Sequence, residues 1–581
     1  MVNVKNLFGM AVMATALVGC SSNDNLAPDG KDNAGKAGEA YASFTINLPT
    51  TTGTGTRGEG DPAQGTPSFE NGDKNEYAVK DATLLLFQKN DDGDFVFKEF
   101  VDLGNMEPWT SSSTSGITTT AKLTAKITKA EVGANKGYYA LIVLNNNSGT
   151  AAKITYPTEG QTYAVWSKNP ANATAANYLK YDNGFFMANA PKYVADAPET
   201  LVKIKNIYAS KQQAENSAAT TVYVERGLAK VSLATGSESK SVTIDGGNYD
   251  KDKVNITGWT LDVTNTKTYP VHVTDGLWAD TWKTTATTAA TNGATMDRFH
   301  DTKLTEFPRV YWGLDPNYST DFATVDACEG EFTMAKKSDF KTGEEAKKAQ
   351  YCLENTFDIA HMMQGQTTRV LFSAKYTPNG FSDGDTFYKM GNSSQLWNAD
   401  KVEAQIKAKA QEVLIEADPS KDPSKVTVTL NAATNNLTKA GVYLVAAANV
   451  QYNSVNITDD EASKINAKLG FKAETPTEAA VGLSTFEGGV SYYIARVKHF
   501  NDLTPWKPGD KTYDGNNANW LGRYGVLRNN WYELTISSVS GPGYPDVPKV
   551  NPTDPDDVND QYINVEVKIL DWAKRSQQVE L

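Results

Sequence analysis

Histidine and cysteine are scarce in this chain, and the chemistry that depends on them is restricted accordingly. The 581 residues contain three cysteines and four histidines, and neither an H-E-x-x-H zinc motif nor a G-x-S-x-G nucleophile motif occurs. The histidines are scattered at His272, His300, His361 and His499. We therefore expect no enzymatic activity, no catalytic residue, no metal site and no cofactor. A glycan-active enzyme that uses paired carboxylates is the alternative that motif inspection leaves open.

Arginine is nearly missing from the first part of the chain, where Arg57 is the only one before Arg226. No basic patch or arginine-rich run occurs, and the formal net charge is −13, so we expect no nucleic-acid partner. Long helical patterns are few, whereas Thr, Val, Tyr, Asn and Gly are plentiful, which predicts a mainly-β fold. Because 581 residues exceed what one hydrophobic core holds, we expect two domains with additional tails.

Apolar runs long enough to cross a membrane are missing after residue 20. Residues 1–20 have the pattern of an export signal, in which Lys5 precedes an apolar stretch at residues 7–17. The signal ends in L-V-G-C at Cys20, the pattern of a lipobox, and we predict that Cys20 carries a lipid. Lipidation would make this an anchored protein and not a membrane-spanning one. Residues 21–40 are polar and predict a disordered tether.

Residues 42–48 alternate between apolar and polar side chains, which predicts a half-buried β-strand. One face of this strand carries Phe44, Ile46 and Leu48. Residues 50–56 are only Thr and Gly, and Arg57 follows alone in this open loop, where a protease can enter. We predict that the strand completes the first domain until a cut between Arg57 and Gly58 frees it. A strand from a partner would then fill the vacancy.

The same loop contains a G-x-G-x-x-G pattern at Gly53, Gly55 and Gly58. A dinucleotide site also needs a helix that opens at the glycines, so that its N-terminal N–H groups meet the phosphates. The residues that follow, EGDPAQGTPS, do not predict a helix. We therefore interpret the pattern as a linker.

Two domains are predicted between the tails, at residues 58–233 and 234–543. In the first, N-D-D-G at residues 90–93 separates two apolar strands and predicts a β-hairpin, and residues 222–233 predict one strand with a charge pair in its middle. In the second, residues 398–414 and 459–469 predict helices, the first capped by Asn398.

The composition changes after residue 543. Residues 544–560 contain four prolines and five aspartates, which predicts a stiff, solvated spacer. A strand follows, with Ile563, Val565, Val567 and Ile569 on one face, and further apolar anchors are Trp572, Val579 and Leu581. Because the spacer is expected to hold this strand away from its own domain, we predict that residues 544–581 donate a strand to a groove on a neighbouring molecule.

Cys328 and Cys352 are the cysteines that remain after the signal. In an exported protein such a pair predicts a disulfide, which would stabilise the fold by about 3 kcal/mol through the loop it closes. Two buried thiols are the alternative. Without a nearby histidine the pair does not predict a zinc site.

Three motifs together resemble the fimbrillins of Bacteroidota, the stalk subunits of type V pili. They are VYVERGLAKV at residues 222–231, YCLENT at residues 351–356 with Q-T-T at 366–368, and GRYGVLRNNWYELTISSVSGPGYP at residues 522–545. The similarity extends over the whole chain, from the lipobox and the isolated Arg57 to the C-terminal strand. The Thr/Gly linker before Arg57 is longer than the resemblance leads one to expect, which leaves the cut site and the enzyme open.

The resemblance implies two β-sandwich-like (transthyretin-like) domains with a few short helices, and it implies a pathway. The lipidated precursor would be anchored to the outer membrane, and an arginine-specific protease would remove residues through Arg57. Copies of the chain and accessory pilins would then assemble by strand exchange into a surface fimbria that supports adhesion and biofilm formation. The alternatives are an accessory tip or anchor pilin and a non-polymerising surface lipoprotein that binds a glycan or a host protein. The sequence does not identify the adhesion target.

Overall fold

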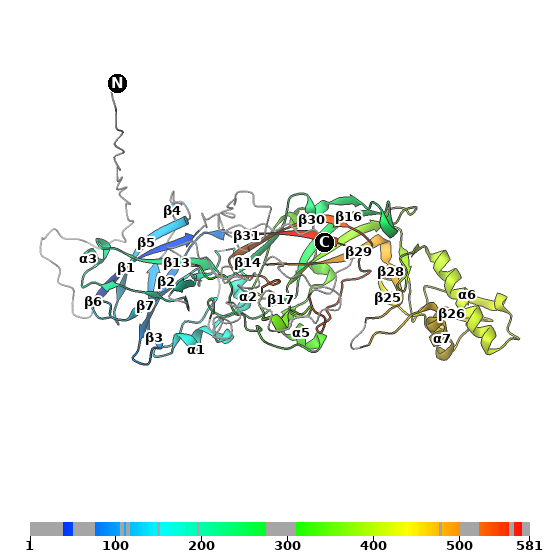
Figure 1. The fold of residues 1–581 in the computed structure, drawn as a ribbon, viewed down its shortest axis with the longest axis horizontal. Helices are drawn as coiled ribbons and strands as arrows, with labels where there is room; N and C mark the ends of the chain where they lie inside the picture. The colour runs from blue at the N-terminus through cyan, green and yellow to red at the C-terminus, as the bar shows by residue number, and fades with distance from the viewer. Residues whose placement is uncertain are drawn as a thin grey trace, which may run out of the picture.

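The structure is a computed structural model of the 581-residue chain. It describes residues 39–49, 76–104, 110–111, 117–147, 152–182, 184–194, 197–274, 309–475, 479–499, 522–556 and 563–571. Several residues predicted to be functional lie outside these ranges, namely Cys20, Arg57, Gly58, Trp572, Val579 and Leu581. The molecule is elongated, with its N-terminal strands at one end and helices α6 (Ala399–Ala417) and α7 (Asp459–Leu469) at the other (Figure 1). The predicted mainly-β fold with few helices is confirmed.

The N-terminal domain, as we use the term, is built on one nine-stranded sheet. Its strand order is β3 (Phe95–Gly104), β2 (Ala82–Lys89), β7 (Tyr138–Leu144), β8 (Met187–Asn189), β13 (Thr220–Arg226), β1 (Ala40–Pro49), β5 (Ile117–Ile127) and β4 (Thr110–Ser111), with β11 (Val202–Lys203) beside β7. The hairpin predicted at residues 90–93 joins β2 to β3, and Gly93 supplies the positive φ of 93° that the turn requires.

This sheet curls so that its two ends approach each other. Glu99 on β3 accepts hydrogen bonds from the backbone N–H groups of Thr128 (2.8 Å) and Lys129 (2.5 Å), which directly follow β5. The curled sheet encloses a core of Leu, Val, Ile and aromatic side chains. Short helices α1 (Tyr163–Ser167), α2 (Ala175–Tyr178) and α3 (Lys211–Glu215) complete the domain.

The C-terminal domain is a sandwich of two sheets. One sheet has the order β20 (Gln350–Cys352), β14 (Ala229–Leu233), β30 (Asn530–Val539) and β31 (Ile563–Asp571). The other has β15 (Ser241–Thr243), β16 (Lys253–Asp262), β21 (Arg369–Thr377) and β29 (Val490–Arg496), with β19 (Lys341–Thr342) also on β16. Side chains of both sheets share one core, in which Trp259 of the second sheet and Tyr532 of the first are fully buried. The β-sandwich-like character that was expected is therefore present.

The strand predicted at residues 222–233 is two strands. β13 ends at Arg226 and β14 begins at Ala229, and the two belong to different sheets. A Cβ on Gly227 would lie 2.8 Å from the ring of Tyr178, so only glycine fits where the chain passes from one domain to the other. The sequence signal for the break is E-R-G at residues 225–227, after which the apolar positions change from even to odd numbers.

A third core lies between β21 and β29, in residues 388–483, which the sequence analysis did not separate from the second domain. Its elements are β22 (Phe387–Met390), β23 (Leu396–Trp397), α6, β24 (Val426–Val428), β25 (Gly441–Tyr443), β26 (Val450–Tyr452), β27 (Val455–Asn456), α7 and β28 (Leu483–Phe486). It forms the end of the molecule away from the N-terminal domain (Figure 1). Both predicted helices are confirmed, and the Asn398 side chain caps α6 by accepting a hydrogen bond from Lys401 N (3.1 Å).

The predicted disulfide is wrong, because Cys328 and Cys352 are both free, buried thiols. Cys328 is on α5 (Val325–Glu331) and packs against Val263 and Phe332, whereas Cys352 on β20 lies in the core of the sandwich. Burial raises the pKa of the Cys328 thiol to about 11 and that of Cys352 to about 12, so both stay protonated at neutral pH. Their sequence spacing does not reveal that they pack in separate cores.

The prediction of a solvated spacer is also wrong for residues 544–556, which we call the strap. The strap lies along the C-terminal domain, and Tyr544 exchanges backbone hydrogen bonds with Tyr492 (2.8 and 2.9 Å). Near the end of the strap, Asp556 is 2% exposed and forms an ion pair with Arg496 (2.8 Å). Proline and aspartate content predicts solvation only while these groups lack partners in the folded domain.

Among the residues that the structure describes, no helix combines the length and the apolar character needed to cross a membrane.

Candidate strand-exchange site

β1 is an interior strand of the N-terminal sheet. It runs parallel to β13, with Phe44 opposite Thr220 and Asn47 opposite Tyr223. On its other side it runs antiparallel to β5, from Ala40 opposite Ile127 to Pro49 opposite Ile117. Removal of β1 would therefore leave a slot with unpaired backbone groups on both walls, β13 and β5. We call this space the β1 slot.

The inward face of β1 is completely buried. Its five side chains are each 0–1% exposed, namely Ala40, Ala42, Phe44, Ile46 and Leu48. Three of them are the residues predicted to face the core. The two alanines indicate that the slot is shallow at its start and deep from Phe44 onward.

Two residues on the polar face of β1 are buried as well, whereas Tyr41 and Thr45 on the same face are partly exposed. Ser43 and Asn47 are each 5% exposed. The Ser43 hydroxyl lies 2.7 Å from that of Thr124 on β5 and donates to the carbonyl of Ala214 on α3 (2.8 Å). The Asn47 side chain accepts a hydrogen bond from the Thr120 hydroxyl (2.7 Å). Short polar side chains can be buried when their hydrogen bonds are satisfied, and alternation does not reveal this.

An empty β1 slot is unstable in water. Burial of each of Phe44, Ile46 and Leu48 contributes about 1.5–3 kcal/mol, so the three together stabilise the strand by roughly 5–9 kcal/mol before backbone hydrogen bonds are counted. Molecules with an empty β1 slot are therefore too rare for a partner strand to bind them at a useful rate. Any replacement of β1 has to proceed as displacement, with the incoming strand pairing as β1 leaves.

β31 is paired with its own domain, which corrects the prediction that the spacer holds it away. It lies antiparallel to β30 at the edge of the first sandwich sheet, with Val565 opposite Ile536 and Val567 opposite Leu534. Opposite residues of an antiparallel pair share one face of the sheet, and Ile536 and Leu534 are fully buried. These positions of β31 are thus paired in register with buried positions of β30. The alternation in residues 563–569 predicts that one face of the strand is buried, but it does not predict which domain buries that face.

The three motifs that resemble fimbrillins meet where the two domains join, and not in the β1 slot. Glu225 at the end of β13 contacts His272 (2.6 Å) and Arg309 (2.9 Å) through its two carboxylate oxygens. Burial by itself would raise the pKa of Glu225, but His272 and Arg309 hold it below its ordinary value. All three side chains are nearly inaccessible, so this charged group is fixed inside the molecule.

The neighbouring residue, Arg226, binds two distant segments. Its Nε donates to the carbonyl of Glu76 (2.6 Å) and its Nη1 to the side chain of Asn529 (3.2 Å). Burial lowers the pKa of Arg226 to about 10, which still leaves the guanidinium charged at neutral pH. The Glu76 carboxylate in turn pairs with Lys230 on β14 (2.8 Å).

Arg528 and Glu354 form a further buried ion pair at the same junction, with Arg528 Nε 3.0 Å from the Glu354 carboxylate. Burial acts to lower the pKa of Arg528, but Glu354 raises it above its ordinary value. The charge pair noticed in residues 222–233 was the sequence signal for this network, although its partners lie more than 40 residues away. These motif residues fix the two domains to each other.

We predict that Arg528→Met destabilises the folded protein by about 3–5 kcal/mol, because it leaves the buried carboxylate of Glu354 without its arginine partner. Urea unfolding followed by tryptophan fluorescence measures the change. The double variant Arg528→Met/Glu354→Gln removes the charge as well and is the matched control, which should recover much of the loss. Equal stability of the single and double variants would show that this ion pair does not hold the junction.

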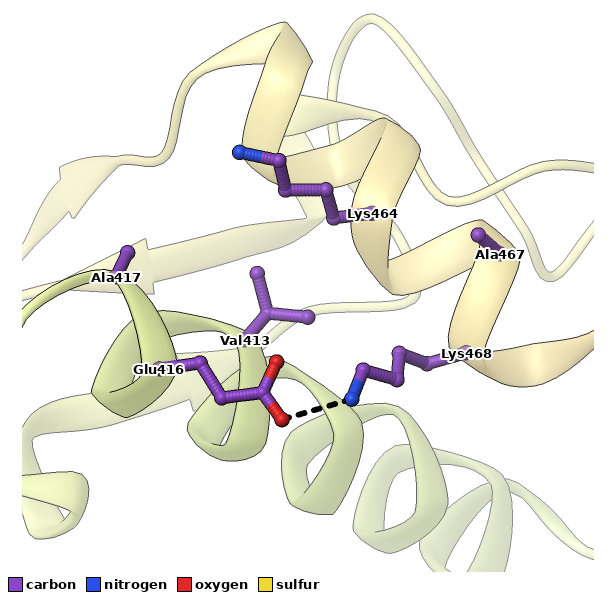
Figure 2. A pocket seen from close by; sticks show the side chains of 6 residues that line it. All are labelled: Val413, Glu416, Ala417, Lys464, Ala467 and Lys468. Carbon is purple, nitrogen blue, oxygen red and sulfur yellow. Dashed lines mark hydrogen bonds and ion pairs between the residues drawn. The ribbon is translucent and has the colours of Figure 1, made fainter.

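No three side chains of His, Cys, Asp or Glu gather closely enough to hold a metal ion in the described part of the chain. A surface pocket of about 420 Å³ lies between α6 and α7 in the third core (Figure 2). It is lined by Val413, Glu416, Ala417, Lys464, Ala467 and Lys468. Lys468 pairs with Glu416 (2.8 Å) and Glu412 (2.9 Å), and Lys464 pairs with Asp460 (2.7 Å). Since both lysines are already neutralised by neighbouring carboxylates, we assign no ligand to this pocket.

The fold and its terminal strands define a class, that of mainly-β proteins in which a strand from each end of the chain completes a sheet. Residues 484–578, which contain β29, the strap, β30 and β31, match the family model described as "Major fimbrial subunit protein type IV, Fimbrillin, C-terminal". The resemblance to fimbrillins is thereby confirmed for residues 484–578, which are similar to the C-terminal region of that family. No curated protein sequence matches the chain.

Solved structures similar to the chain come from Bacteroidota. A putative cell adhesion protein from Parabacteroides distasonis is 10% identical, with 92% of this chain and 99% of that chain covered and a TM-score of 0.35. A fimbrilin (fimA) from Porphyromonas gingivalis is 12% identical, with the same coverage and TM-score. A putative cell adhesion protein from Bacteroides eggerthii is 11% identical, with coverages of 94% and 98% and a TM-score of 0.32. The match to the fimbrillin model is confined to residues 484–578.

Proposed function

We propose that the chain is a structural subunit of a surface fimbria that polymerises by strand exchange. The observation that carries the proposal is the position of β1, an interior strand that comes from the N-terminal end of the chain. Residues 50–75 join β1 to the rest of the domain, and they contain Arg57. One cut in this segment turns β1 from a covalent part of the sheet into a replaceable ligand of the β1 slot.

The precursor stage uses the N-terminal residues. Lipid on Cys20 anchors the precursor to the outer membrane, and β1 keeps the apolar slot covered during export, so that the exposed walls do not pair prematurely. An arginine-specific protease then cuts between Arg57 and Gly58. Residues 1–57 carry four basic and four acidic side chains, so the mature chain keeps a net charge of −13.

The donor is β31 of a second copy. Among the strands that the structure describes, β31 pairs with β30 alone, whereas in the β1 slot it would have two neighbours, β13 and β5. Main-chain hydrogen bonds on both sides and side chains in pockets are the usual basis of strand addition. When β31 moves from the edge of one sheet to the interior of another, it therefore gains the backbone hydrogen bonds to a second neighbouring strand. Trp572, Val579 and Leu581 would add apolar contacts beyond the strand.

Polymerisation consequently requires two releases. β1 has to be cut free at Arg57, and β31 has to leave β30 of its own chain. Until both happen, the slot and the donor strand are each occupied within one molecule. Such mutual occupation keeps the precursor monomeric, because neither apolar face is available to a neighbour.

The experiment that tests the proposal is analysis of protein sheared from the cell surface. A ladder of SDS-resistant oligomers whose N-terminus is Gly58 supports a polymerising stalk subunit, made of copies of this chain with or without accessory pilins. Lipidated monomer that retains residues 21–57 would contradict it and favour an anchor pilin or a non-polymerising lipoprotein that binds a glycan or a host protein. The surface ligand itself would need a separate binding screen.

We predict that Cys20→Ala abolishes lipid attachment and surface fibres, and that unprocessed precursor accumulates in the periplasm. The physical reason is that a chain without lipid has no stable anchor to the membrane. Radiolabelled fatty acid and immunoblots of cell fractions measure the change. Cys328→Ala is the matched control, because that thiol is buried and far from the signal, and it should leave lipidation intact. Normal fibres from Cys20→Ala would exclude the lipoprotein route.

A further inference from the structure

The wall of the β1 slot that contains β13 is interrupted near the start of β1. Tyr208 exchanges two backbone hydrogen bonds with Tyr41 (both 2.8 Å), whereas β13 begins to pair with β1 only at Phe44, opposite Thr220. Between these two points the chain leaves the wall and forms α3, which packs against both β1 and β5 (Figure 1). We call residues 209–219 the cover.

The cover is attached to β5 and to β1 by one side chain from each strand. From β5, the Lys122 ammonium group donates to the carbonyl of Glu215 at the end of α3 (2.8 Å). From β1, the Ser43 hydroxyl donates to the carbonyl of Ala214 (2.8 Å). The Ala214 side chain is fully buried, so the cover is closed at this point. The strand that occupies the slot therefore helps to hold the cover in place.

Two threonines of β5 contact the polar face of β1. Thr124 is directly opposite Ser43 in the register, and Thr120 is directly opposite Asn47. Because Ser43 gives its only hydroxyl hydrogen to Ala214, the hydrogen bond between the Ser43 and Thr124 hydroxyls (2.7 Å) uses the hydrogen of Thr124. The Thr120 hydroxyl likewise donates to the Asn47 side chain (2.7 Å). Both threonines thus donate to polar atoms of the strand in the slot.

This arrangement discriminates between side chains at position 43. An apolar side chain there would leave the Thr124 hydroxyl without its acceptor and would not hold the cover. A long charged side chain would not fit in the space that Ser43 fills, because Ser43 is almost completely buried. Thr45 lies on the same face but is partly exposed, so position 45 lacks this restriction.

We propose that Thr124 and the cover determine which strands the β1 slot accepts. The accepted partner is a strand with one apolar face, whose other face carries a short hydroxyl or amide side chain at two positions four residues apart. Recognition then depends on both faces of the incoming strand, and a strand that is merely apolar on one face binds poorly. This inference rests on the proposed function, since it concerns the choice among strands that can replace β1.

Peptide competition tests the recognition at position 43 without any polymerisation. The full chain is cut between Arg57 and Gly58 and incubated with a fluorescent peptide of residues 39–57, which exchanges with the bound N-terminal fragment. Unlabelled variant peptides then compete with the fluorescent one, and fluorescence anisotropy measures the bound fraction. Ser43→Thr and Ser43→Val are the matched pair of peptides, because threonine and valine have nearly the same shape and differ in the hydroxyl group.

The Ser43→Thr peptide should compete within about threefold of the parental peptide, whereas Ser43→Val should compete about 10–100-fold more weakly, because it makes neither hydrogen bond. Thr45→Val is the control on the same face and should compete within about twofold of the parent. Equal competition by Ser43→Thr and Ser43→Val would overturn the inference alone. A cut chain that takes up no peptide would instead contradict the proposed function, and the inference with it, because β1 would not be replaceable.

Hydrogen exchange tests the link between position 43 and the cover. The amide hydrogens of residues 213–217 should exchange several-fold faster when the slot holds the Ser43→Val peptide than when it holds Ser43→Thr, because valine cannot donate to Ala214. Equal exchange rates would show that the occupant does not hold the cover, and that part of the inference would be wrong.

Thr124→Val in the chain tests the other partner of Ser43. The preference for the Ser43→Thr peptide over Ser43→Val should fall by about 3–10-fold, because one of the two hydrogen bonds is lost. Thr120→Val is the matched control, since Thr120 contacts Asn47, and the preference at position 43 should stay unchanged. An undiminished preference in Thr124→Val would overturn the role of Thr124.

Discussion

Arg57→Ala is expected to leave the protein on the cell surface as a lipidated monomer, with polymer reduced by about 10²–10³-fold. Uncut, β1 stays tethered by residues 50–75 at an effective concentration of the order of millimolar, while donor strands from other subunits are present at roughly micromolar concentration. The tethered strand therefore returns to the β1 slot before a donor completes its displacement. Quantitative immunoblots of sheared material, boiled and unboiled, measure the ratio of monomer to oligomer.

A second arginine provides the matched control for Arg57→Ala. Placing it two residues downstream, as Glu59→Arg in the Arg57→Ala background, restores a cut in the same segment and should restore polymerisation. Arg57→Lys separates enzyme specificity from charge, since a protease that requires arginine leaves this variant monomeric as well. Polymerisation of Arg57→Ala at the parental level would mean that the slot becomes available without a cut at this position, and the mechanism would need another trigger.

Local patterns predicted the secondary structure well where each element is determined by its own residues. The N-D-D-G turn, the Asn398 cap and the alternation of residues 42–48 correspond to the β2–β3 hairpin, α6 and β1. In each case the signal is a hydrogen bond or a periodicity contained within about ten residues. The inward face of β1 followed from the same alternation, because a buried strand places every second side chain in the core.

Tertiary partners were not predictable in the same way. Nothing in the sequence near Asp556 indicates that this carboxylate meets Arg496 sixty residues earlier, so its segment was interpreted as a solvated spacer. Cys352 and Cys328 likewise have a spacing suited to a disulfide, yet the fold places them in separate cores. The motif at residues 222–231 was recognised for its resemblance, but its role at the domain junction depends on Glu354, Arg528 and Asn529. These contacts result from the fold as a whole.

The third core illustrates the same limit at a larger scale. α6 and α7 were predicted individually, but their packing into a separate unit with β22 and β28 was not. Helix amphipathicity indicates that one face of a helix is buried, but it does not identify the element that packs against that face. The buried side chains of residues 388–483 form a core distinct from that of the sandwich.

Val565→Asp is expected to abolish donation of the C-terminal strand while Glu566→Lys leaves it intact. Val565 pairs in register with Ile536, which is fully buried, and we expect a carboxylate at position 565 to cost several kcal/mol. Glu566 is opposite Thr535, which is only half-buried, and its replacement should change stability by no more than about 0.5 kcal/mol. The same face would enter the β1 slot of the next subunit, so one substitution affects both the resting and the donated strand.

Mixing experiments distinguish loss of donation from loss of folding. A Val565→Asp subunit cut at Arg57 retains its own β1 slot and should still accept a strand, so it ends a growing fibre when mixed with parental subunits. The length distribution in electron micrographs should therefore shorten as the fraction of Val565→Asp rises, whereas Glu566→Lys should leave it unchanged. A variant that simply fails to fold would not enter fibres and would not shorten them. If Glu566→Lys ended fibres and Val565→Asp did not, the strand would be donated in a register shifted by one residue, because such a shift exchanges the two faces.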